Sequence, residues 1–232
     1  MNEREFLGKI KDLGVLTIPD VSHIIGKDRR YAALYMKRLN DRGVVNRIKK
    51  GKYALPDTDP LVVATNLVIP SYISFLSGLA YHHKTTQIPI TIQVATTISR
   101  KAINYGSRII FVRLNRKRLF GYKRKKIGNG YAFIGEIEKV IVDSLFMPKY
   151  CPLSETMDAF DGVDTGKILN YALKMDSIVT LKRLGYLLEL NGVDAYGKIK
   201  SHINKRYDLL NPLLPSAGKN NPKWRIKINE VL

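Results

Sequence analysis

The chain has 232 residues, of which 45 % are hydrophobic, and it carries a formal net charge of +19. The length allows one large domain or two smaller ones, and the apolar fraction is ordinary for a globular protein with a buried core. The single cysteine, Cys151, excludes an intrachain disulfide, and the charge indicates an anionic partner such as nucleic acid. The chain does not open with the basic-then-apolar pattern of a secretory signal, so we expect a cytoplasmic protein.

Residues 1–43 predict three helices. Apolar residues at helical spacing indicate the first, over residues 2–13. Thr17-Ile18-Pro19 suits the start of a second helix, which Gly26 ends. Asp28 is a suitable N-cap for a third helix, which Gly43 should end. The buried stripe of this third helix should contain Ala32, Tyr35, Met36 and Leu39.

Two short strands, over residues 44–48 and 52–55, should follow and be joined by Lys49-Lys50-Gly51. Three helices and a hairpin within residues 1–56 are the pattern of a winged helix-turn-helix, in which the third helix enters the major groove and the hairpin contacts phosphates. These residues include 13 basic and 6 acidic side chains. We therefore predict a domain that binds double-stranded DNA, with an ordinary solvated face as the alternative. Its candidate contacts are Lys27, Arg29, Arg30, Leu34, Lys37, Arg38, Arg47, Lys49, Lys50 and Lys52.

The turn-rich, acidic segment at residues 56–60 predicts a boundary to a second domain, residues 60–232. Residues 60–83 carry no charged side chain and are long enough to span a bilayer. Polar residues and Pro70-Ser71 interrupt this stretch, so we expect two short helices, near 60–68 and 71–82, and no membrane partner.

The rest of the chain predicts strands first and helices afterwards. Within a strand-rich region, residues 88–135, runs of β-branched and aromatic residues indicate strands at 90–95, 109–114 and 131–134. Helical patterns follow at 136–147, 154–161, 165–175, 178–191 and 195–206, and a last strand is expected at 223–229. The expected fold class is therefore α+β: an N-terminal winged helix-turn-helix, then a mixed domain with a small sheet and a helical half over residues 136–206.

Basic residues are concentrated beyond the first domain as well. Residues 60–135 contain no acidic residue and 12 basic ones, 11 of which lie in residues 100–126. We predict a second basic surface, formed by Arg100, Lys101, Arg116, Lys117, Arg118, Lys123, Arg124, Lys125 and Lys126. Phe120, Tyr122 and Tyr131 lie near it in sequence and could stack on unpaired bases, or could close the core of the sheet. The surface could contact DNA or RNA, or could be a solvated hairpin.

The sequence contains no strong enzyme signature, so we expect a protein that is not an enzyme and that has no cofactor or metal. Glu136, Glu138 and Asp143 form the best acidic cluster and would suit a metal-dependent nuclease. The simpler interpretation is that Glu136 lies in the first turn of a helix and meets the helix dipole.

Six segments occur in an order and spacing that resemble the AbiEi-type antitoxins, regulators of viral defence in type IV toxin-antitoxin (abortive infection) systems. The segments are RIKKGKYAL, PSYISFLSGLAYHH, ITIQVATT, IGEIEKVIVDSLF, LKRLGYLLELNG and NPKWRIKIN. The resemblance implies a winged helix that represses its own operon by binding an inverted-repeat operator, and a C-terminal domain that counteracts a nucleotidyltransferase-like toxin.

The resemblance also points to individual residues. Arg47 to Tyr53 match the wing, and Lys182 and Arg183 match a helix of the family, which makes them candidates for antitoxicity. A surface charge or a helix-terminal ion pair is the alternative for Arg183. Val140 and Val142 replace the small residues common in the family, so their helix is expected only to pack. Three functions stay open: a DNA-binding antitoxin and autorepressor, an RNA-binding module that uses residues 100–126, and a metal-dependent nuclease.

Overall fold

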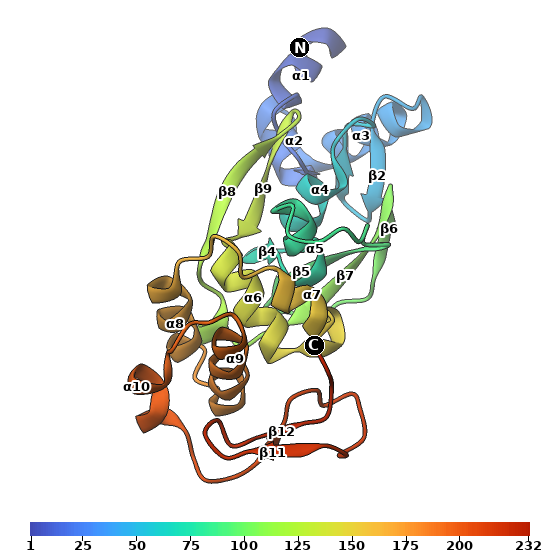
Figure 1. Cartoon of the computed structure of the whole chain (residues 1–232). Coiled ribbons are helices and arrows are strands. Elements are labelled where there is room, and N and C mark those ends of the chain that lie inside the picture. Colours follow the sequence, from blue (N-terminus) through green and yellow to red (C-terminus); the bar gives the residue numbers. More distant parts are fainter. The chain divides into compact units, whose positions relative to one another are not determined.

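The structure is a computed structural model that describes all residues, 1–232, and has an α+β fold (Figure 1). The chain divides into two compact units. Unit 1 comprises residues 1–73, 90–114 and 123–134, and unit 2 comprises residues 74–89, 115–122 and 135–232. No helix combines the length and the apolar character that crossing a membrane requires.

Residues 1–56, the N-terminal module, contain three helices and a three-stranded sheet with the order β1-β3-β2. Its elements are α1 (Glu3–Ile10), β1 (Leu16–Thr17), α2 (Ile18–Ile25), α3 (Arg29–Asp41), β2 (Asn46–Lys49) and β3 (Lys52–Ala54). Three predicted helix ends are confirmed: Thr17 and Asp20 form a capping box, Asp28 accepts a bond from the Tyr31 N–H, and Gly26 is left-handed. The first helix ends at Ile10, earlier than predicted.

The module has an apolar core of its own. Phe6, Ile10, Val21, Met36 and Tyr53 are among its buried members and come from all three helices and from β3. This core shows that residues 1–56 bury apolar surface among themselves, as a separate domain would. The same residues also contact the rest of unit 1, since Tyr105 Oη donates a hydrogen bond to Leu55 O. The predicted boundary at residues 56–60 therefore stays a prediction.

The larger sheet has six strands in the order β6-β7-β5-β4-β9-β8. The strands are β4 (Ser71–Ile73), β5 (Thr91–Thr96), β6 (Ile103–Tyr105), β7 (Ser107–Arg113), β8 (Tyr122–Ile127) and β9 (Gly130–Gly135). β5 is parallel to β7 and antiparallel to β4, and β4 is parallel to β9. Helix α4 (Pro60–Asn66) packs on this sheet, where Asn66 donates to Tyr131 O and Thr65 Oγ1 accepts from the Phe133 N–H.

The prediction of a helix over residues 71–82 is wrong at its start. Ser71–Ile73 form the strand β4 in the interior of the sheet, and only Phe75–Tyr81 form a helix, α5. Tyr72 and Ile73 are fully buried there. Three residues are too few to show the alternation that identifies a strand, so only pairing with β5 and β9 decides their conformation.

Unit 2 is organised around helix α6 (Ile137–Phe146), which α5, α7, α8 and α9 surround. Its other elements are η1 (Arg116–Arg118), η2 (Pro148–Tyr150), α7 (Leu153–Asp158), α8 (Thr165–Lys174), α9 (Ile178–Leu190), α10 (Tyr196–Ile199), η3 (Lys200–His202), β10 (Asp208–Leu209), β11 (Lys219–Asn221) and β12 (Ile226–Ile228). Val140 lies against Gly78 of α5, where an added Cβ would come within 2.7 Å of it, which agrees with a packing role for α6.

The prediction of a long helix at residues 195–206 is also wrong. An α-helix covers only Tyr196–Ile199, and a 3₁₀ turn follows at Lys200–His202. Ile199 is the one side chain of these two elements that is buried, so no apolar stripe exists to stabilise a longer helix by packing.

Candidate nucleic-acid interface

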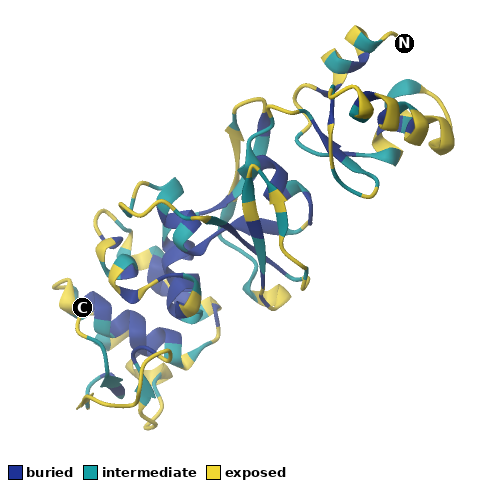
Figure 2. Cartoon of the chain, turned by 90° about the vertical axis from the view of Figure 1, so that its right-hand side faces the viewer, coloured by how far each residue is buried: buried dark blue, intermediate teal, exposed yellow.

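Helix α3 presents a basic face to solvent. Ala32, Met36 and Leu39 are buried, whereas the opposite side of the helix is exposed (Figure 2). The exposed side carries Arg29, Arg30, Leu34, Lys37 and Arg38, and Lys27 is exposed just before the helix. None of these five basic side chains forms an ion pair, so their charges are available to an anionic ligand.

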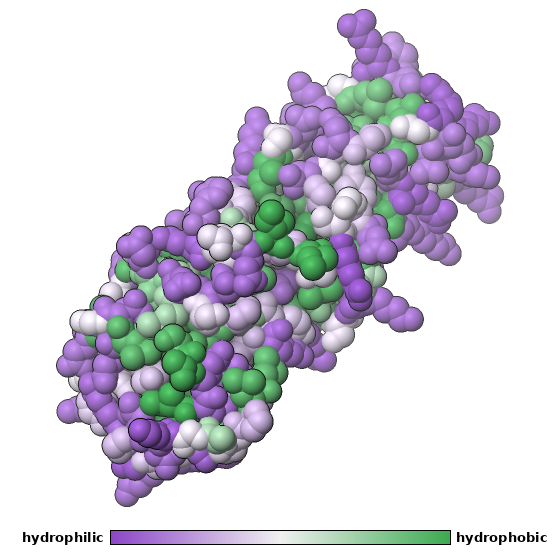
Figure 3. All heavy atoms as spheres, turned by 45° about the vertical axis from the view of Figure 1, so that its right-hand side comes forward, coloured by the Kyte–Doolittle hydropathy of each residue, from purple (hydrophilic) through white to green (hydrophobic).

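The β2–β3 hairpin lies beside this helix. The Arg47 N–H donates to Asn40 Oδ1 of α3 at 2.9 Å, which links the two elements. Arg47 and Lys50 are exposed, whereas Lys49 and Lys52 are half-buried. Gly51 has a φ of +72°, which fits the role in the turn that its sequence position predicts. In Figure 3 hydrophilic side chains dominate the visible surface of the N-terminal module.

The predicted second basic surface stays a prediction, and its members lie on different elements of the fold. Arg100 and Lys101 precede β6, at one edge of the six-stranded sheet, whereas Lys123 to Lys126 lie on β8, at the opposite edge. Arg116, Lys117 and Arg118 belong to unit 2. In the strand order β6-β7-β5-β4-β9-β8, proximity in sequence therefore does not bring Arg100 and the β8 lysines to the same edge.

The β8 strand is exposed along its basic run. Lys123, Arg124, Lys125 and Lys126 are all exposed, and the Arg124 guanidinium lies over the ring of Tyr131 at 3.8 Å from its centroid. The Tyr131 ring therefore already has a cation–π partner. An edge strand rich in lysine also discourages pairing with another sheet, which is a structural reason for the same residues.

Arg118 has a structural role in unit 2. Its Nε donates to Met175 O at 2.7 Å, its Nη2 donates to Asp176 O at 3.0 Å, and its guanidinium lies over the Phe146 ring. Nearby, Phe120 packs against Tyr171 and has the ammonium groups of Lys139 and Lys174 over its ring. Of the predicted aromatic candidates, Phe120 thus stabilises the packing of unit 2. Arg116 and Lys117 remain exposed.

The two candidates for antitoxicity are buried. Lys182 is 0 % exposed, and its Nζ donates to Asp208 Oδ2 at 2.6 Å, to Asn204 Oδ1 and to Arg206 O. Arg183 is 5 % exposed, and it donates to Leu145 O and Leu209 O. Burial lowers the pKa of Arg183 to about 10, and the charge of Asp208 opposes that shift. Neither side chain is a surface charge, so any contribution to antitoxicity would act through the C-terminal segment that they hold.

The carboxylates considered for a nuclease have partners within unit 2. Asp143 is fully buried, forms an ion pair with Lys139 and accepts a bond from Ser74 Oγ at 2.8 Å. Glu136 and Glu138 both pair with Lys167. Burial, followed by the hydrogen bond to Glu136, raises the pKa of Tyr171 to about 12. No group of three His, Cys, Asp or Glu side chains lies close enough together to hold a metal ion.

Sequence reasoning missed the buried ammonium of Lys139. Burial lowers its pKa and the neighbouring Asp143 opposes that shift. The sequence did contain a signal for this ion pair, because Lys139 and Asp143 are four residues apart in a predicted helix. Side chains at that spacing lie next to each other on a helix.

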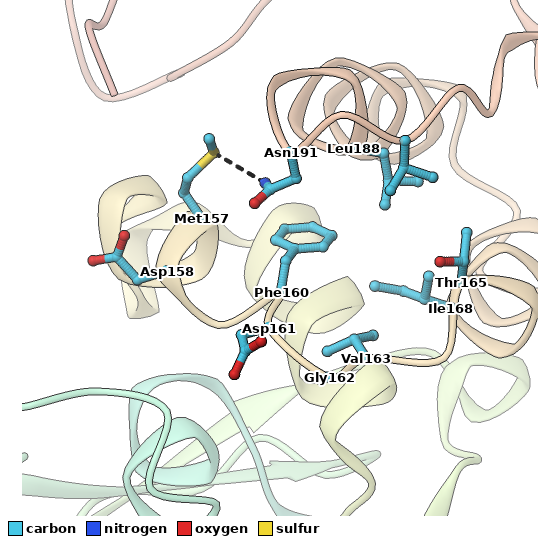
Figure 4. A pocket seen from close by; sticks show the side chains of 11 residues that line it. Met157, Asp158, Phe160, Asp161, Gly162, Val163, Thr165, Ile168, Leu188 and Asn191 are labelled. Atoms are coloured by element: carbon cyan, nitrogen blue, oxygen red, sulfur yellow. Dashed lines mark hydrogen bonds between the residues drawn. The ribbon is translucent and has the colours of Figure 1, made fainter.

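Unit 2 also contains a pocket of about 530 Å³ beside α7, α8 and the end of α9 (Figure 4). Apolar side chains such as Phe160, Ile168 and Leu188 line it, and its charged lining residues, Asp158 and Asp161, are both acidic. Because negative charge repels phosphate, this pocket does not suit a nucleic-acid ligand.

No protein-family model matches the chain, and no curated protein matches it in sequence. Among solved structures, the chain is similar to the crystal structure of the RV2827C protein from Mycobacterium tuberculosis. The TM-score is 0.62 at 12 % sequence identity, and the match covers 96 % of this chain and 89 % of that one. At this identity the similarity shows a shared fold over nearly the whole chain.

Proposed function

We propose that the protein is a DNA-binding autorepressor and antitoxin of a toxin-antitoxin operon, acting in the cytoplasm without catalysis of its own. In this proposal residues 1–56 are a winged helix-turn-helix, α3 is the recognition helix and the β2–β3 hairpin is the wing. The antitoxin part rests on the six segments that resemble the AbiEi-type antitoxins. The toxin that it counteracts would then be nucleotidyltransferase-like.

The observation that carries the DNA-binding part is the exposed face of α3. Arg29, Arg30, Lys37 and Arg38 lie there without an acidic partner, on a helix whose other side is fixed by the core of the module. A rigid helix with unpaired basic side chains has the charge and the size to enter the major groove. In this proposal Arg47 and Lys50, which are exposed on the adjoining hairpin, contact the flanking phosphates.

The DNA-binding part is tested by binding measurements on the full chain with three ligands: duplex from its own promoter, random duplex of equal length, and structured RNA. We expect the promoter duplex to bind most tightly, at a site with inverted repeats. Tighter binding of the RNA would instead support an RNA-binding module, with the exposed β8 strand as its first candidate surface.

The antitoxin part is tested in cells. The chain is expressed together with a nucleotidyltransferase-type toxin encoded beside its gene, and growth is followed. We expect growth to be restored. Full toxicity in the presence of the folded chain would contradict the antitoxin role and leave the DNA-binding part intact.

A further inference from the structure

Three cationic side chains from two distant segments converge within unit 1. Lys49 and Lys52 lie directly opposite each other in the β2–β3 hairpin, and Arg100 comes from the loop between β5 and β6. Lys52 Nζ and Arg100 Nη1 donate to the same oxygen, Leu67 O, at 2.9 Å and 3.3 Å. Leu67 is the C-cap of α4, so its carbonyl lies at the negative end of the helix dipole.

One carbonyl does not neutralise three cations. None of the three side chains forms an ion pair, and like charges directly opposite each other in a hairpin are destabilising. Partial burial, and then the charges of Arg100 and Lys52, lower the pKa of Lys49. Burial and then Arg100 also lower the pKa of Lys52, against a smaller opposing effect of Asp20. The cluster therefore has an excess of positive charge that a bound anion would relieve.

The donors that remain suit a phosphate. An ammonium carries three N–H groups and a guanidinium carries five, so one bond each to Leu67 O leaves most of them unused. The Arg100 guanidinium also lies over the ring of Phe111, at 5.9 Å from the centroid, which limits its motion. Arg100 is half-buried and Lys101 beside it is exposed, so the site opens to solvent at the loop.

We propose that Lys49, Lys52 and Arg100 together bind one phosphodiester group of the DNA, so that the DNA-contacting surface extends from the hairpin onto the larger sheet. This inference rests on the proposed DNA binding. It places Arg100 in one site with Lys49 and Lys52 of the hairpin, whereas the sequence predicted that Arg100 belongs to a separate surface.

The first test measures how the affinity of the full chain for duplex DNA depends on salt. The salt slope is the slope of the logarithm of the binding constant against the logarithm of the salt concentration. We expect Arg100→Gln to reduce the size of this slope by up to about one unit. Between 50 and 200 mM salt, the affinity of the variant would then fall by about 3.5-fold less than that of the wild type. Lys52→Gln should act similarly. Because both contact one phosphate, the double variant should lose about one unit in total and not two.

The controls separate charge from structure. The amide introduced by Arg100→Gln can still donate to Leu67 O, so this variant removes the charge and keeps a donor. Arg100→Lys keeps the charge and should therefore retain the salt slope of the wild type. Lys198→Gln removes the same charge from an exposed position on α10 and should also leave the slope unchanged. An unchanged slope for Arg100→Gln, or losses of two units in the double variant, would overturn the shared site.

A second measurement needs no DNA and keeps the two proposals apart. Inorganic phosphate, compared with chloride at equal ionic strength, should raise the unfolding temperature of the wild-type chain and of Lys198→Gln by more than that of Arg100→Gln. The comparison between variants is needed because phosphate also stabilises folded proteins in general. Equal stabilisation of all three proteins by phosphate would overturn the site even if DNA binds. Selective stabilisation without any DNA binding would support the anion site and contradict the proposed function.

Discussion

The N-terminal module and unit 2 use the same basic residue types in opposite ways. On α3 the arginines and lysines are exposed and unpaired, whereas Lys139, Lys182 and Arg183 of unit 2 are buried and donate hydrogen bonds to oxygen atoms. An exposed cation costs the fold little and remains available to a ligand. A buried cation must have partners, since leaving one unpaired is strongly destabilising. Basic residues are therefore available to a ligand in one region and serve stability in the other.

The largest effect should come from breaking a buried pair in unit 2. Asp208→Ala removes the carboxylate that faces the fully buried Lys182 ammonium. We expect the free energy of unfolding to fall by about 3–5 kcal/mol, because an uncompensated charge stays buried. Chemical denaturation measures this. As a control, Asp158→Ala removes an exposed carboxylate of the same unit and should change little. If both variants have the same stability, the buried cations do not support the fold as we infer.

The second-largest effect should come from disturbing a packing contact in unit 2. An added Cβ at Gly185 of α9 would come within 2.1 Å of Cζ3 of Trp224, a fully buried and rigid ring. We expect Gly185→Ala to destabilise unit 2 by about 1–3 kcal/mol, despite the better helix propensity of alanine. Thermal unfolding measures this. Gly197→Ala lies in open space on α10 and should be neutral or slightly stabilising. A stabilised Gly185→Ala protein would contradict the contact.

On the basic face of α3, substitution should leave the fold intact and change recognition. Arg30→Ala removes an exposed, unpaired side chain. If Arg30 contacts a guanine edge, the preference for the promoter over random duplex should fall by about 1–3 kcal/mol. Competition binding with both duplexes measures the preference, and circular dichroism checks the fold. Retention of the full preference would remove Arg30 from direct base readout.

The smallest effect should come from removing a single phosphate contact. Lys50→Ala, at the exposed tip of the hairpin, should weaken binding to promoter and random duplexes equally and reduce the salt slope by about one unit. Lys9→Ala is a suitable comparison, because Lys9 on α1 is already paired with Glu5. If Lys50→Ala changed the preference for promoter over random duplex, the wing would contact bases as well as phosphates.

Local chemistry was sufficient to predict much of the fold. The caps at Thr17 and Asp28, the left-handed Gly26 and Gly51, and the helices around 137–146, 165–174 and 178–190 all follow from residues that interact over one or two turns. The strands β5, β7 and β9 were predictable because their β-branched and aromatic runs are long enough to show a pattern. The exposed and buried sides of α3 followed in the same way from helical periodicity.

The remaining features depend on partners that are distant in the chain. Strand β4 exists because β5 and β9 pair with it, and strand order alone places Arg100 and the β8 lysines at opposite edges of one sheet. The burial of Lys182 and Arg183 requires Asp208 and backbone carbonyls of distant segments. A positive charge looks the same in a sequence whether it is solvated or enclosed. For Lys182 and Arg183, only the tertiary structure supplies the oxygen atoms that make the difference, because these atoms come from residues with no fixed spacing to the charge.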